Sequence, residues 1–73
     1  MLATVRIDTI AKVKDFVNKV NTLNGDFDLK SDRYTVDAKS IMGIFSLDLT
    51  KDLTLVYTDD VNKVTETLKD FIQ

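Results

Sequence analysis

The spacing of hydrophobic residues switches repeatedly along this chain between a period of two, typical of strands, and a period near 3.6, typical of helices. Residues 2–8 and residues 53–58 follow the first pattern. Residues 26–30 and 34–38 follow it on either side of a polar turn, which is typical of a hairpin. The sequence therefore predicts four short strands.

Helical spacing appears in three other segments. Asp8 or Thr9 can cap the first of these helices, and Asn24-Gly25 can end it, because both residues tolerate the left-handed conformation. A short second helix begins at Ser40, and a third follows the acidic pair Asp59-Asp60. The expected apolar stripes are Ile10, Val13, Phe16, Val17, Val20 and Leu23 in the first helix and Val61, Val64, Leu68, Phe71 and Ile72 in the third.

The order strand, helix, strand, strand, helix, strand, helix fits within only 73 residues. One antiparallel sheet with the helices packed on a single face satisfies this order best, so the sequence predicts an α+β two-layer fold. The chain is 44% hydrophobic and 30% charged and contains no proline, which is typical of a regular globular domain. We expect a single domain, 1–73.

Composition excludes several classes of chemistry. Without cysteine there is no disulfide or thiolate metal site, and without histidine the usual imidazole base and metal ligand are missing. We therefore expect no enzyme activity, cofactor or metal, and we assign no chemistry to Asp26, Asp28, Asp59 or Asp60. A net charge of −2 with mixed signs gives no footprint for nucleic acid or membranes, and no secretion signal is evident, so we expect a cytoplasmic protein.

The second predicted helix is apolar over most of its circumference. Ile44 and Leu47 fall on one side of it, and we assign that side to the core. The other apolar sector consists of Ile41, Met42, Phe45 and Leu49. A short helix of this kind in a small domain is expected to leave an apolar patch exposed for a partner. Ser40 is expected to cap the helix, and Gly43 indicates that something approaches the backbone closely.

Residues 39–43, Lys-Ser-Ile-Met-Gly, continued by Ile44, Ser46 and Leu47, resemble the regulatory-serine segment of HPr. HPr is the histidine-containing phosphocarrier protein of the bacterial sugar phosphotransferase system. The resemblance implies an open-faced β-sandwich, with four antiparallel strands covered on one face by three helices. It further implies that a serine kinase modifies Ser40 and that a partner-binding site comprises Lys39, Ile41, Met42 and Phe45. Lys39 would supply a cation beside the phosphate.

The phosphocarrier activity of that family depends on a histidine at the start of its first helix, followed by alanine, arginine and proline. Counting back from Ser40 without a gap places Thr9, Ile10, Ala11 and Lys12 there. A threonine phosphate is a stable ester and Ala11 has no guanidinium group, so we expect no phosphocarrier activity. Thr9 is expected to be only a helix cap.

The sequence therefore favours an HPr-like regulatory protein that acts by being bound and lacks the active histidine. Its expected partners are an HPr kinase/phosphorylase and a transcriptional repressor or an enzyme. Two alternatives stay open: an interaction module of the same fold in which Ser40 is only a cap, and, less favoured, a phosphocarrier component. A homodimer also stays open.

Overall fold

The computed structural model describes residues 1–73 and has the predicted order of elements. Its strands are β1 (Leu2–Val5), β2 (Phe27–Lys30), β3 (Thr35–Asp37) and β4 (Leu53–Tyr57), and its helices are α1 (Ile10–Val20), α2 (Ile41–Phe45) and α3 (Val61–Thr67). All strand pairs are antiparallel, in the order β1-β4-β2-β3. The α+β two-layer prediction is confirmed.

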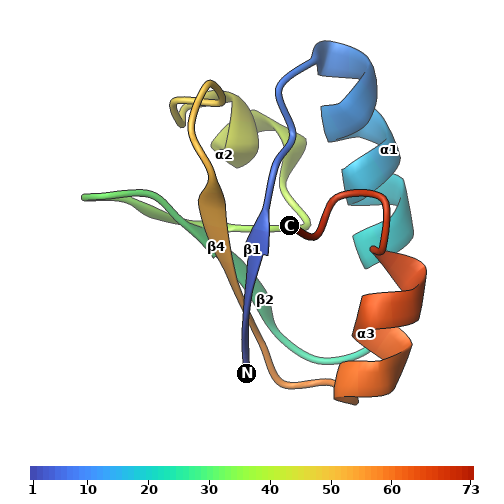
Figure 1. Ribbon diagram of the computed structural model, residues 1–73. Helices are drawn as coiled ribbons and strands as arrows, with labels where there is room; N and C mark the ends of the chain where they lie inside the picture. Colours follow the sequence, from blue (N-terminus) through green and yellow to red (C-terminus); the bar gives the residue numbers. More distant parts are fainter.

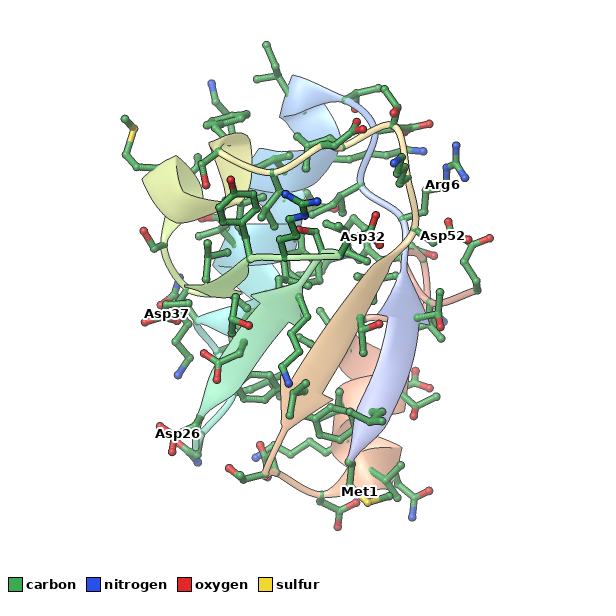
Figure 2. All side chains as sticks on the ribbon, turned by 90° about the vertical axis from the view of Figure 1, so that its left-hand side faces the viewer. Met1, Arg6, Asp26, Asp32, Asp37 and Asp52 are labelled. Atoms are coloured by element: carbon green, nitrogen blue, oxygen red, sulfur yellow. The ribbon has the colours of Figure 1, made fainter.

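The three helices lie on one side of the sheet (Figure 1), and the strands face the viewer in Figure 2 with α1 and α3 behind them. Alternate side chains of the strands point toward the helices and are buried, as in Leu53, Leu55 and Tyr57 of β4. The core joins these side chains to the buried faces of the helices. The opposite face of the sheet stays open, as the resemblance implies.

The last residues of the chain run along the free side of β1. Ile72 forms an antiparallel bridge with Val5, the amide of Arg6 donates to the carbonyl of Phe71 at 2.9 Å, and the amide of Gln73 donates to that of Thr4 at 2.9 Å. Strand β1 therefore lies between β4 and the C-terminal segment (Figure 1).

The predicted end of the first helix is wrong. Helix α1 ends at Val20, with Asn21 in the right-handed conformation. The side chain of Asn21 donates to the carbonyl of Val17 at 2.8 Å. The hydroxyl of Thr22 donates to the carbonyl of Lys19 at 2.6 Å. These side chains satisfy the terminal carbonyls, so the helix needs no left-handed residue. Gly25 does adopt a positive φ of 93°, but in the loop beyond.

The first turns of α1 and α3 project beyond the core, which the apolar stripes did not predict. Ile10 is 65% exposed and Val61 is 40% exposed, whereas the remaining residues of both stripes pack inward wholly or partly. Helix α3 is also shorter than expected and ends at Thr67. The chain then turns, because Ile72 pairs with β1 instead of continuing the helix.

Candidate functional site

Ser40 caps α2 as predicted. Its backbone is extended, with φ −102° and ψ 109°, and its hydroxyl oxygen accepts from the amide of Gly43 at 3.2 Å. A Cβ atom on Gly43 would lie 3.3 Å from the Cβ of Val36, a tight contact. The close approach that Gly43 indicated therefore comes from packing of α2 against β3.

The two sides of α2 differ as predicted. Ile44 and Leu47 are buried, whereas Met42 is 76% exposed and Phe45 is 41% exposed. Ile41 is only half-buried and contacts the core with part of its side chain. The most exposed apolar side chains of α2 are therefore those of Met42 and Phe45.

Leu49 does not belong to the outward sector to which its spacing assigned it. It is half-buried and packs against the core. The helical wheel failed here because α2 ends at Phe45, with Ser46 as its C-cap, so helical spacing no longer applies to Leu49.

The ammonium group of Lys39 contacts the loop before β2. Its Nζ donates to the carbonyl of Leu23 at 3.1 Å and to that of Gly25 at 3.4 Å, and it lies 5.6 Å from the centre of the Phe27 ring. In this structure Lys39 therefore binds the loop before β2, and Ser40 is not among its hydrogen-bond partners.

The start of α1 has the same kind of cap. The hydroxyl oxygen of Thr9 accepts from the amide of Lys12 at 3.1 Å. Lys12 Nζ also lies 3.1 Å from Asp8 Oδ1, and this hydrogen bond with its charge holds the pKa of Asp8 below its usual value. At the start of α1, Thr9 therefore forms a cap, and Asp8 and Lys12 form an exposed ion pair.

Asp60 caps α3 by accepting from the amides of Asn62 and Lys63, at 2.8 and 3.4 Å. Asp59 accepts from the amide of Asn24 at 3.3 Å. These carboxylates therefore satisfy main-chain donors near the start of α3, in keeping with the structural roles expected of them.

One surface hollow was not anticipated from the sequence. It lies where the β2–β3 turn approaches the segment between α2 and β4, and most of the residues that line it are polar or charged, with both signs of charge present. Tyr34, which shares the alternating pattern of residues 34–38 with Val36, is 65% exposed and lines this hollow. The reason is that Tyr34 precedes β3 and belongs to the turn, so strand alternation does not fix its direction. No sequence pattern marked the hollow, because it joins segments far apart in the chain.

No helix of the structure has both the length and the apolar character needed to cross a membrane.

No known protein-family model matches this chain, and no curated protein matches it. Solved structures do. HPr-C-His from Thermoanaerobacter tengcongensis superposes with a TM-score of 0.79 at 24% identity, over 96% of this chain and 88% of that one. The phosphocarrier protein HPr from Bacillus anthracis strain Ames superposes with a TM-score of 0.76 at 25% identity, over 100% of this chain and 96% of that one.

A histidine-containing phosphocarrier protein from Mycoplasma gives a TM-score of 0.71 at 12% identity, over 100% of this chain and 97% of that one. The agreement extends over nearly the full length of all three chains. This protein therefore has the HPr fold: an open-faced β-sandwich of four antiparallel strands and three helices.

Proposed function

We propose that this protein is an HPr-like regulatory protein related to the phosphotransferase system, and that it acts in the cytoplasm by binding other proteins. Its docking surface, defined as Ile41, Met42 and Phe45, would be controlled by phosphorylation of Ser40. The observation that carries this proposal is the division of α2, which buries Ile44 while Met42 and Phe45 remain exposed beside a serine cap.

Exposed aromatic and methionine side chains support a docking role because such residues are enriched at protein interfaces. The side chain of Met42 can adapt to differently shaped partners. Neither side chain is among the buried residues of the core. Single exposed apolar residues are common, so the argument depends on their grouping on one short helix.

Phosphocarrier activity is not proposed. The chain contains no histidine, and Thr9 caps the helix whose start corresponds to the active centre of HPr. Ala11 and Lys12 follow it, and Lys12 is paired with Asp8. A hydroxyl group at this position would form a stable phosphate ester rather than a phosphoryl group that can be passed on.

The experiment that tests this proposal is incubation with an HPr serine kinase and ATP, followed by measurement of the intact mass. The γ-phosphoryl group would pass to Ser40 Oγ, leaving ADP. We expect one added phosphoryl group on the wild type and none on Ser40→Ala. Thr9→Ala is the matched control, because it removes the other capping hydroxyl group, and it should be labelled like the wild type.

A wild-type protein that an active kinase leaves unlabelled would favour the second candidate, an interaction module without phosphorylation. The exposed pair Met42 and Phe45 supports that candidate equally, since a docking surface does not require a modified serine. Labelling that persists in Ser40→Ala would move the regulatory position elsewhere.

A further inference from the structure

The side chain of Lys39 connects three parts of the molecule. It extends from the residue before the Ser40 cap, its ammonium group donates to two carbonyls of the α1–β2 loop, and it lies over the ring that begins β2. The carbonyls belong to Leu23 and Gly25, and the ring is that of Phe27. One positive charge therefore binds the start of α2 to the loop that we define as residues 23–26.

The side chain of Leu23 is buried in the core and fixes the start of loop 23–26. The rest of the loop has few other attachments. The amide of Asn24 donates to Asp59 Oδ2 at 3.3 Å, and the amide of Asp26 donates to Thr58 Oγ1 at 3.1 Å, both at exposed positions. Exposed hydrogen bonds of this kind open easily. The contacts of Lys39 are therefore a substantial part of what holds the loop beyond Leu23.

We propose that Lys39 couples phosphorylation of Ser40 to the conformation of loop 23–26. This inference rests on the proposed modification of Ser40. A phosphoserine carries a charge of about −1.5 to −2 near neutral pH, and it would lie one peptide bond from Lys39. An ammonium–phosphate pair is stronger than a hydrogen bond to a neutral carbonyl. The ammonium group then leaves the Leu23 and Gly25 carbonyls, and the loop loses this attachment.

The consequence is a second surface that differs between the two states of the protein. In the unmodified protein, the ammonium group covers the carbonyls of loop 23–26. In the phosphorylated protein, these carbonyls become free to accept hydrogen bonds from a partner. A protein that distinguishes the two states can therefore contact this loop as well as the docking surface on α2.

The test uses phosphoserine incorporated at position 40 during synthesis, so its outcome does not depend on any kinase. Amide hydrogen exchange is measured for the phosphorylated and unmodified proteins. We expect phosphorylation to speed exchange of the Asn24 and Asp26 amides by roughly three- to tenfold. The amide of Arg6, which is bonded to Phe71 in another part of the molecule, serves as the internal reference and should not change.

Lys39→Met supplies the matched control because it keeps an apolar stem and removes the ammonium group. Unmodified Lys39→Met should already show the faster exchange at Asn24 and Asp26, and phosphorylation should add little to it. Lys39→Arg, which keeps the charge, should restore a response to phosphorylation.

Three results would overturn the proposal: unchanged exchange in the phosphorylated wild type, equal effects of phosphorylation with and without the ammonium group, or faster exchange at every amide including Arg6. Failure of a kinase to label Ser40 would instead count against the proposed function and would leave this measurement unaffected.

Discussion

Helices α1 and α2 both begin with a hydroxyl side chain that accepts from the amide three residues later, at 3.1 Å for Thr9 and 3.2 Å for Ser40. Their surroundings differ. Beside Thr9 lies the exposed ion pair of Asp8 and Lys12, whereas Ser40 is half-buried and leads into a helix with exposed apolar residues. A capping hydroxyl is therefore common to both starts, and only the neighbouring residues separate a structural cap from a candidate regulatory position.

The largest expected difference between the two helix starts is that the start of α1 should accept no phosphoryl group. A donor driven by phosphoenolpyruvate should leave the protein unphosphorylated, because no histidine is present to accept the phosphoryl group. The measurement is intact mass with and without acid treatment, using an active HPr as the positive control. An acid-labile adduct on this protein would break the contrast between the two helix starts.

The next effect concerns how each helix is anchored. Helix α1 buries Val13, Phe16, Val17 and Val20, whereas α2 buries only Ile44 within its length and depends also on Leu47 beyond it. Leu47→Ala should therefore cost about 2–5 kcal/mol of unfolding free energy, since it removes buried area and leaves a cavity.

Phe45→Ala is the matched control for this measurement and should cost within about 1 kcal/mol, because the ring is partly in solvent. Chemical denaturation of both variants provides the comparison. Equal losses would place the Phe45 ring in the core and reduce the docking surface to Ile41 and Met42.

The affinity for partners should depend on Phe45 although the stability of the fold depends on it only weakly. Phe45→Ala is expected to weaken association with an HPr kinase or another partner by about 2 kcal/mol, because it removes an aromatic anchor. Ile10→Ala, which truncates an exposed residue at the other helix start, serves as the control in the same titration. A larger loss from Ile10→Ala would transfer the principal docking role to the start of α1.

Removing either cap should have a smaller and similar effect on stability. Ser40→Ala and Thr9→Ala are each expected to cost about 0.5–2 kcal/mol, since each leaves one amide of the first turn without its partner. Thermal or chemical unfolding of the two variants would check this. A much larger loss at Ser40 would show that its hydroxyl has a further structural partner in the folded protein.

The smallest expected effect is a pH dependence of stability that comes from the ion pair at the start of α1. The hydrogen bond and charge of Lys12 lower the pKa of Asp8 in the folded protein, so this ion pair stabilises the fold above the carboxyl group's ordinary pKa. The contribution is lost as the pH falls through the lowered pKa, below about pH 4. The stability difference between wild type and Asp8→Asn should therefore shrink on acidification. In the Lys12→Met background that pH dependence should largely disappear.

Much of the sheet could be predicted from the sequence because strand alternation is local. Leu53, Leu55 and Tyr57 alternate with half-buried residues, as a strand with one inner face requires. Helix lengths were less predictable, because Ile10 and Ile72 keep helical spacing although one lies in solvent and the other pairs with Val5. Pairing with a distant strand leaves no mark in local periodicity.

In the candidate site, too, the features set by local spacing could be predicted and the long-range contact could not. The cap at Ser40 and the outward direction of Met42 follow from spacing along α2, and both were predicted. The contact of Lys39 with Leu23 and Gly25 was not, because it joins residues 14 and 16 positions apart through a turn of the chain. Long side chains that fold back on distant loops are set by tertiary structure.

The place of β1 between β4 and the C-terminal segment bears on how the chain is made. Leu2 to Val5 are synthesised before their partners, Leu53 to Val56 on one side and Ile72 on the other, which emerge from the ribosome much later. The strands of the β2–β3 hairpin, in contrast, can meet as soon as both are outside the exit tunnel. During translation β1 stays unpaired until these residues have emerged, so a nascent chain should complete its sheet only after Ile72 has left the exit tunnel.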